Sequence, residues 1–285
     1  MIYISSSCVQ ENQIFKSIER LVSLGFRNIE LSGGTNYYPS LENDLLKLKN
    51  EFNLNYLLHN YFPPPKDHFV ANIASLDQEI YQRTIDHYLQ AIDLSKILEA
   101  GKFGLHAGYL IDFQPSETGN VIKNRTLANR QEALNKMAEG LSTLQEAAGN
   151  EVTLYLENNV LSSKNYLEYG NKSPFLVCNL DDFYEFSSLT KFNLLFDLAH
   201  FKVSQKSQEK FFEEDYFALM SASNYIHLSG NDGFTDQNKS ILQDVDLLDV
   251  LTRENLTNKT VTLEVYDGND AIMESYEFLE NLLDE

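Results

Sequence analysis

The segment Val152–Glu157 reads Val-Thr-Leu-Tyr-Leu-Glu, a short β-branched and aromatic run that ends in a carboxylate. Such a run, bounded by polar residues, is typical of a buried strand. Before it, Thr126–Ala148 shows helical periodicity, and after it a second apolar run, Asn193–Asp197, again ends in an acid. A strand, a polar loop and a helix therefore form the unit that predicts the fold.

This unit recurs along all 285 residues. The clearest helical patterns are at Asn12–Leu24, Leu41–Glu51, Glu79–Ala100, Thr126–Ala148 and Glu209–Ala222. The predicted strands are Ile2–Ser5, Asn28–Leu31, Asn55–His59, Phe103–His106, Val152–Glu157, Asn193–Asp197, Tyr225–Leu228 and Thr260–Val265. Strands that alternate with helices indicate a parallel sheet. Because no linker divides residues 1–285, we predict one α/β domain, a (β/α)8 TIM barrel, for which about 250 residues are typical.

Two nucleotide-binding folds lack their motifs here. No G-x-G-x-x-G follows the first predicted strand, where the sequence is Ser5-Ser-Ser-Cys8, and no P-loop sequence occurs. We interpret Gly33-Gly34 as a turn after the second strand. The sequence therefore indicates neither a Rossmann domain nor a P-loop enzyme.

The charge balance disfavours nucleic acid as a partner. Forty-two acidic residues against 22 basic ones give a net charge of −20. Nucleic-acid binding draws much of its affinity from Lys and Arg that neutralise phosphates. A small molecule, or a metal held among carboxylates, is the better expectation.

The sequence also bears on location. No stretch approaches the roughly 18 uninterrupted apolar residues that suggest a membrane span. The N-terminal residues show neither the basic n-region nor the apolar h-region that is typical of a signal peptide. Cys8 and Cys178 are too few for a disulfide framework. We therefore expect a cytoplasmic protein without a membrane partner, and the sequence leaves its oligomeric state open.

Ionisable residues interrupt the apolar strand patterns near the strand ends. They are Glu30, His59, His106, Glu157, Asp197, His227 and Glu264. In a barrel these ends converge on one mouth, where the active sites of this fold lie. Carboxylates gathered there would be costly to desolvate without a cation. We therefore predict a divalent metal, of which Zn, Mn, Co and Fe suit His and carboxylate ligands.

Each of these residues also has a purely structural interpretation, as a hydrogen-bonded His or a helix-terminal acid. For Glu30, the sequence does not decide between a position at the rim of the barrel and a structural role. His200 follows Asp197 by three residues and could reach the same mouth. We interpret His68 and His87, in a loop and a helix, as surface residues.

The series Glu157, Asp-Leu-Ala-His at 197–200, His-Leu-Ser-Gly-Asn-Asp-Gly at 227–233, and Glu264 resembles the xylose-isomerase-like TIM barrels. That superfamily includes sugar isomerases and epimerases, inosose dehydratases and endonuclease IV. The resemblance to its ketose epimerases implies one metal held by Glu157, Asp197, His227 and Glu264. It also implies that the two glutamates are the acid/base pair and that His200 contacts a substrate oxygen.

The first half of the chain is more similar to endonuclease IV, in His59-Asn-Tyr-Phe-Pro, Asn72-Ile-Ala-Ser75 and His106-Ala-Gly108. That similarity implies a second metal on His59, His106 and Glu157. A third metal would need a His where Asp236-Gln-Asn238 stands, so we predict instead that His59 and His106 bind substrate hydroxyls, with the second metal as the alternative. The sequence also lacks an Arg shortly after His227 and a second Glu shortly after Glu157, which ketohexose epimerases use to grip substrate.

We therefore predict a metal-dependent isomerase or epimerase of a sugar or sugar phosphate. Its chemistry would be proton transfer next to a carbonyl through a metal-bound enediolate, with Glu157 and Glu264 as catalytic groups. The alternatives are an endonuclease IV-like phosphodiesterase and an inosose- or dehydroshikimate-type dehydratase. Long loops at 61–77, 107–125 and 158–179 are expected to face the substrate. Tyr61, Phe62, Tyr109 and Phe113 would form an apolar wall there, unless they pack on helices.

Overall fold

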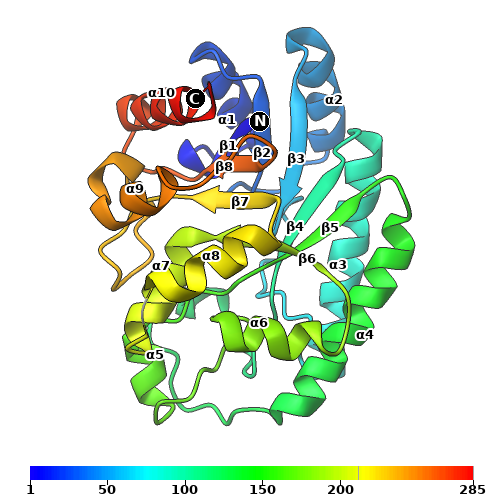
Figure 1. The fold of residues 1–285 in the computed structure, drawn as a ribbon. Helices are drawn as coiled ribbons and strands as arrows, with labels where there is room; N and C mark the ends of the chain where they lie inside the picture. Colours follow the sequence, from blue (N-terminus) through cyan, green and yellow to red (C-terminus); the bar gives the residue numbers. More distant parts are fainter. Residues whose placement is uncertain (211, 285) are drawn as a thin grey trace.

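The structure is a computed structural model that describes residues 1–210 and 212–284. Its parallel strands close into a barrel in the order β1 to β8, and β8 pairs with β1 (Figure 1). The strands are β1 Ile2–Ser5, β2 Asn28–Leu31, β3 Asn55–His59, β4 Lys102–His106, β5 Thr153–Glu157, β6 Asn193–Asp197, β7 Tyr225–Leu228 and β8 Thr260–Leu263. The predicted single-domain (β/α)8 barrel is confirmed.

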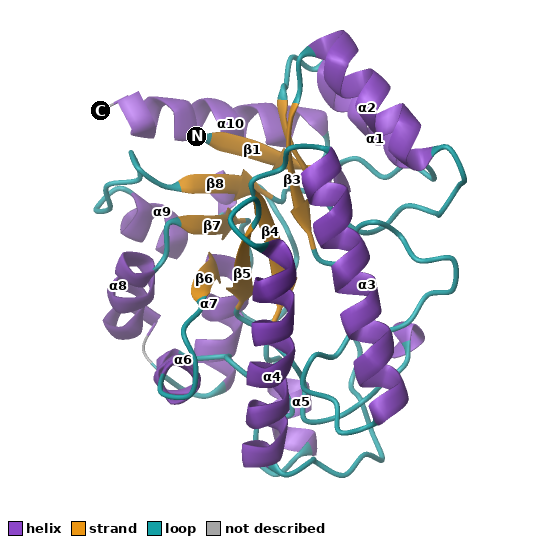
Figure 2. Ribbon diagram, turned by 90° about the vertical axis from the view of Figure 1, so that its right-hand side faces the viewer, coloured by secondary structure: helices purple, strands orange, loops and turns teal. Residues whose placement is uncertain are grey.

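The helices lie outside the barrel, with the long α3 and α4 side by side along it (Figure 2). They are α1 Ile14–Ser23, α2 Leu41–Phe52, α3 Gln78–Ile97, α4 Arg130–Ala148, α5 Ser163–Glu168, α6 Leu180–Ser187, α7 Leu198–Ser207, α8 Phe212–Ala222, α9 Val245–Leu251 and α10 Asn269–Asp284. The predicted start of one helix moves because a cap fixes it: the Asn129 side chain accepts from Glu132 N, so α4 begins after it. Among the described residues, no helix is long and apolar enough to cross a membrane.

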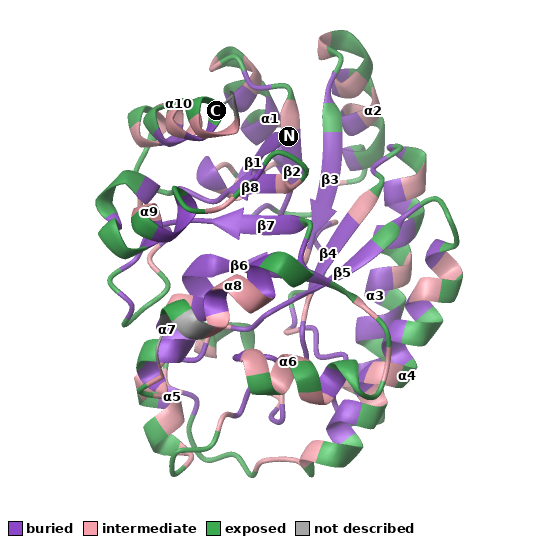
Figure 3. Cartoon of the chain, in the orientation of Figure 1, coloured by how far each residue is buried: buried purple, intermediate pink, exposed green. Residues whose placement is uncertain are grey.

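Successive side chains along each strand point alternately to the core between barrel and helices and to the inside of the barrel. In β5, Leu154 and Leu156 belong to the core between barrel and helices, whereas Tyr155 belongs to a cluster inside the barrel. That inner layer consists of Tyr3, Leu57, Tyr155, Leu195 and Tyr225, all buried. Figure 3 shows the barrel strands coloured as buried along most of their length. Two residues further along β3, β5, β6 and β7 come His59, Glu157, Asp197 and His227. The period of two therefore places these ionisable groups together above an apolar floor.

A glycine in β4 makes room for one of these groups. A Cβ on Gly104 would lie 2.9 Å from Cδ2 of His59 and 2.7 Å from Cδ1 of Leu195. Gly104 pairs with His59 across the β3–β4 ladder. The absence of a side chain at 104 thus lets the imidazole of His59 lie inside the barrel.

The expectation that His68 and His87 are both surface residues holds for His68 and is wrong for His87. His68 is exposed, but His87 on α3 is only 5% exposed. Tyr61 and Phe69 of the β3–α3 loop fold back over it, with ring centroids 6.1 and 5.7 Å from its own. Burial lowers the pKa of His87 to about 4, and its Nε2 has no hydrogen-bond partner among the described residues.

His87 is expected to make the fold sensitive to acid. Its folded-state pKa lies below the unfolded value, so its contribution to stability is complete above pH 6.5 and is lost as the pH falls towards 4. A shift of that size corresponds to roughly 3 kcal/mol of unfolding free energy. Urea unfolding of His87→Phe at several pH values should show a shallower loss of stability than the unaltered protein. The exposed control His68→Phe should keep the original dependence, and identical slopes for all three proteins would contradict this prediction.

Candidate active site

The predicted site residues meet at the carboxyl ends of the strands. His59, His106, Glu157 and Asp197 are the last residues of β3, β4, β5 and β6. Glu264 comes directly after β8, because the ladder ends at Leu263 rather than at the predicted Val265. Its backbone N–H still donates to Leu228 O at 3.0 Å, which keeps Glu264 beside β7.

The carboxylate of Glu157 lies at the centre of the group and is fully buried. Its Oε2 is 2.8 Å from His59 Nε2 and 3.1 Å from His106 Nδ1. Its Oε1 is 3.3 Å from His227 Nδ1. One carboxylate therefore contacts two separate sets of imidazoles, one through each oxygen.

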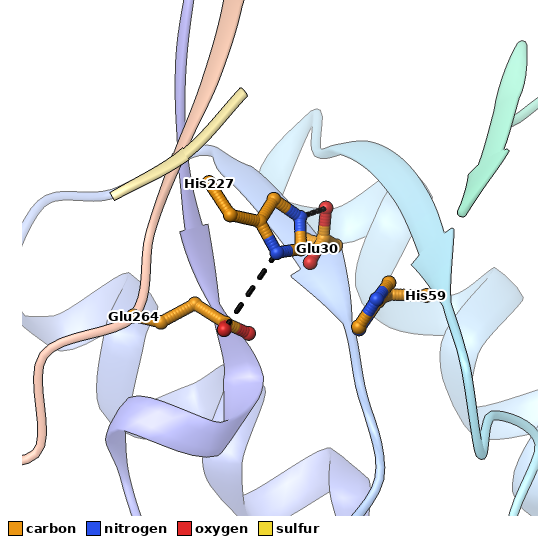
Figure 4. Close-up of side chains that lie close together, drawn as sticks. All are labelled: Glu30, His59, His227 and Glu264. Carbon is orange, nitrogen blue, oxygen red and sulfur yellow. Dashed lines mark hydrogen bonds and ion pairs between the residues drawn. The ribbon is translucent and has the colours of Figure 1, made fainter. Parts of the chain in front are cut away.

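His227 lies between three carboxylates. Figure 4 shows its ring between Glu30 and Glu264, with Nε2 3.1 Å from Glu30 Oε2 and Nδ1 3.6 Å from Glu264 Oε2. Glu30 also accepts hydrogen bonds from the hydroxyls of Tyr225 and Thr262. Glu30 is thus a fully buried residue inside the barrel, where it accepts from His227 and leaves Nδ1 directed at Glu157 and Glu264.

Asp197 and His200 are held in place by Asn158, which the sequence argument missed. The side chain of Asn158 accepts from Asp197 N at 2.8 Å, and its backbone oxygen lies 2.9 Å from His200 Nδ1. Asp197 caps α7 by accepting from His200 N at 2.7 Å. The imidazole of His200 reaches the mouth, where its Nε2 is 3.4 Å from Asp236 Oδ2. The only sequence signal for Asn158 is its place directly after Glu157.

Proton affinities in the cluster are strongly shifted. Burial acts to raise the pKa of Glu157, but His106 and His59 lower it well below its ordinary value. Burial raises the pKa of Asp197 to about 7. Burial opposes protonation of His227, yet Glu30 and Glu264 raise its pKa well above the ordinary value. Protonated imidazoles thus offset buried negative charge, a task that a bound cation can also perform.

The donor set fits a divalent cation. Three sets bring ligand atoms within 4.8 Å of one another, namely Glu157, Asp197 and His227; Glu30, His59, His227 and Glu264; and His59, His106 and Glu157. Three buried atoms in them have no hydrogen-bond partner among the described residues: His227 Nδ1, Glu157 Oε1 and His106 Nδ1. Buried polar atoms are normally satisfied, so unpartnered nitrogen and oxygen atoms that face one another indicate ligands.

A cavity of about 980 Å³ opens above this cluster. All three long loops contribute to its wall, and Tyr61, Tyr109 and Phe113 are among the residues that line it. Phe62 does not, because it is fully buried in the hydrophobic core. The structure adds Phe175, which packs on Tyr109 with ring centroids 5.4 Å apart.

Comparisons with known proteins agree with this architecture. A D-tagatose 3-epimerase-like protein has a TM-score of 0.74 at 19% identity, over 99% of this chain and 97% of that one. The D-psicose 3-epimerase of Clostridium cellulolyticum gives 0.65 at 12%, over 99% of both chains. Endonuclease IV from Thermus thermophilus gives 0.64 at 11%, over 99% of this chain and 98% of that one. At such low sequence identities, the TM-scores show a shared fold and nothing more.

No curated protein matches the sequence. The model of the xylose isomerase-like TIM barrel family, in contrast, matches residues 18–282, nearly the whole chain. The motif series, the closed barrel and the cluster at its mouth agree with that match. The chain therefore belongs to the xylose isomerase-like TIM barrel family.

Proposed function

We propose that this protein is a metal-dependent isomerase or epimerase of a carbohydrate. The observation that carries the proposal is the arrangement of two carboxylates, Glu157 and Glu264, on the same imidazole nitrogen of His227 at the base of a large cavity. Both glutamates are among the residues that line that cavity, which places them next to a bound substrate. The sugar epimerases among the structurally similar proteins support this choice.

Glu157, Asp197, His227 and Glu264 are the residues that we expect to hold the cation. A divalent cation here would polarise a substrate carbonyl and stabilise the negative charge that develops on its oxygen. Asp197 and His227, unlike the two glutamates, do not line the cavity. We therefore assign them to metal binding alone, and the two glutamates to metal binding and proton transfer.

The two glutamates account for the chemistry. One removes the proton from the carbon next to the carbonyl, and the other delivers a proton. Delivery to the opposite face of the same carbon gives the epimer, whereas delivery to the neighbouring carbon gives the isomer. His200, which lines the cavity, is placed to donate a hydrogen bond to a substrate oxygen.

This proposal is tested by proton exchange in deuterated water. The metal-loaded protein, incubated with a panel of ketoses, should introduce deuterium at the carbon next to the carbonyl, as detected by proton NMR. The exchange should disappear when a chelator removes the metal. Absence of exchange across the panel, with metal demonstrably bound, would count against an isomerase. Release of water with formation of an unsaturated product would indicate the dehydratase instead.

A second candidate function is a phosphodiesterase related to endonuclease IV. The observation that favours it is the group formed by His59, His106 and Glu157, which could hold a second cation. Asn238, in contrast, offers an amide rather than an imidazole where a third ligand set would need His. Metal analysis and an assay on abasic-site DNA distinguish the two: one ion per chain without cleavage supports the isomerase, and efficient cleavage supports the phosphodiesterase. Loss of one of two ions in His106→Ala would assign His106 to a second metal rather than to substrate.

Glu30 is expected to strengthen metal binding by orienting His227. Glu30→Gln places an amide N–H₂ among the donors of His227, Tyr225 and Thr262, so His227 loses its carboxylate acceptor. Loss of such a partner typically weakens metal affinity by about 10–100-fold. Competition with a chelator measures this change. Thr262→Val removes one hydrogen bond to Glu30 but keeps the carboxylate, so it should have a smaller effect. An unaltered affinity in a folded Glu30→Gln variant would contradict the role.

A further inference from the structure

The cavity wall carries no permanent positive side chain. Among the described residues that line it there is neither Lys nor Arg, whereas Glu11, Glu157, Asp236 and Glu264 all contribute carboxylates. Its imidazoles are already matched with acids: His59 and His106 with Glu157, and His200 with Asp197 and Asp236. Away from the proposed cation at the base, a phosphate on a substrate would therefore meet Glu11 and Asp236 and no Lys or Arg.

Carboxylates also accept hydrogen bonds from backbone N–H groups near the usual phosphate position of a TIM barrel. In this fold, phosphate commonly binds backbone N–H groups in the loops after the seventh and eighth strands. Here Phe234 N donates to Asp232 at 2.8 Å, Ser240 N donates to Asp267 at 3.0 Å, and Asn231 N donates to Asp244 at 3.1 Å. Three backbone donors of the loop after β7 are thus engaged by carboxylates.

Two lysines of α7 that reach the loop after β7 are bound by its carbonyl oxygens and by nearby side chains. Lys202 Nζ lies 2.6 Å from Asp244 and 3.1 Å from Asp246. Lys206 Nζ donates to Asp232 O and lies 3.7 Å from the ring centroid of Phe234. On the opposite side, Arg125 pairs with Glu117 at 3.0 Å. None of the three lines the cavity.

What lines the cavity instead suits hydroxyl groups. Neutral donors and acceptors come from side chains that include Ser7, Asn12, Asn60, Asn120, Ser162 and Thr235. Opposite the charged base, Tyr109, Phe113 and Phe175 pack edge to face or tilted on one another, with centroids 5.3–6.4 Å apart. Amides and hydroxyls pair with sugar hydroxyls, and aromatic rings cover the apolar C–H faces of a sugar.

We infer that the substrate is an uncharged, polyhydroxylated carbohydrate and that its phosphate ester is rejected. This inference rests on the proposed carbohydrate chemistry and narrows its substrate class. The rejection is electrostatic: a phosphate in the cavity brings negative charge next to Glu11 and Asp236 without a cationic partner.

Matched pairs test the inference. Binding of D-fructose and D-fructose 6-phosphate, and of D-ribulose and D-ribulose 5-phosphate, is measured by calorimetry on the metal-loaded protein, with deuterium exchange followed in parallel. The neutral member should bind at least about 10-fold more tightly in each pair, a difference of about 1.4 kcal/mol. Tighter binding of the phosphates, or no binding of any neutral sugar at millimolar concentration, would overturn the inference. Preferential binding of neutral sugars without deuterium exchange would support it while refuting the proposed isomerase.

An added cation should reverse part of the selectivity. Gln10 is exposed at the cavity rim, and no hydrogen bond holds its side chain among the described residues. Gln10→Arg should raise the affinity for the phosphates relative to the neutral sugars by roughly 10-fold. The length-matched neutral variant Gln10→Met should leave the ratio unchanged. If Gln10→Arg, folded and metal-loaded, shifts the ratio no more than Gln10→Met, the missing cation is not the cause of selectivity, and the electrostatic explanation is overturned.

Discussion

Replacing His227 by alanine is expected to abolish metal binding and, with it, all carbohydrate exchange. His227 is fully buried, and its Nδ1 faces both Glu157 and Glu264 without a hydrogen bond. The substitution removes a ligand and leaves several carboxylates close together without the imidazole that offsets their charge. We expect the loss of affinity to exceed the roughly 10–100-fold change typical of a residue that merely orients a ligand. Elemental analysis after dialysis against a defined metal buffer measures the occupancy.

His68→Ala is the matched control for this experiment, because His68 is exposed and lies outside the cavity wall. It should keep the full metal content and the full exchange rate. Circular dichroism establishes whether His227→Ala is folded. Full metal occupancy in a folded His227→Ala protein would show that the proposed ligand set is wrong.

The second large effect is expected from Glu157→Gln and Glu264→Gln. Each amide keeps the size of the side chain but can neither remove nor deliver a proton at the substrate. General acid–base groups typically contribute about 10²–10⁴-fold to the rate. We therefore expect deuterium exchange to fall by at least about 100-fold in either variant. The sugar should still bind, because the aromatic wall and the neutral donors of the cavity are unchanged.

Glu146→Gln, on the exposed side of α4, is the corresponding control and should exchange at the original rate. Metal content must be measured alongside the rate, because both glutamates are also proposed ligands. A variant that retains its metal and its sugar binding but loses exchange identifies a proton-transfer group. Retention of exchange within a factor of about two in both variants would remove the two glutamates from the mechanism.

The barrel could be predicted because each strand is a short, largely apolar run with a polar residue at or near its carboxyl end. Asn193–Asp197 and Tyr225–Leu228 have the predicted bounds in the structure. β4 begins one residue before the prediction, at Lys102, whose amine lies 4.9 and 5.0 Å from the ring centroids of Tyr155 and Tyr225. A pattern of apolar residues does not predict a lysine in a barrel strand, because the two aromatic rings that stabilise its amine belong to residues distant in the sequence.

Contacts between distant segments explain what the sequence did not predict in the site. Glu30 meets Tyr225, His227 and Thr262, which are 195, 197 and 232 residues away. Its role depends on barrel closure, which brings the side chain of Glu30 on β2 to residues of β7 and β8. No local sequence pattern predicts these contacts. His87 was misplaced for a similar reason, since the loop that buries it turns back across α3 only in the folded chain. Residues at strand ends could be predicted because the fold alone brings them together.

The apolar floor of Tyr3, Leu57, Tyr155, Leu195 and Tyr225 gives the barrel a single entrance. Because these side chains are buried and packed together beneath the carboxylates, traffic to and from the site must pass the open mouth. In the proposed function, a cation bound at the base therefore enters before the sugar and leaves after it.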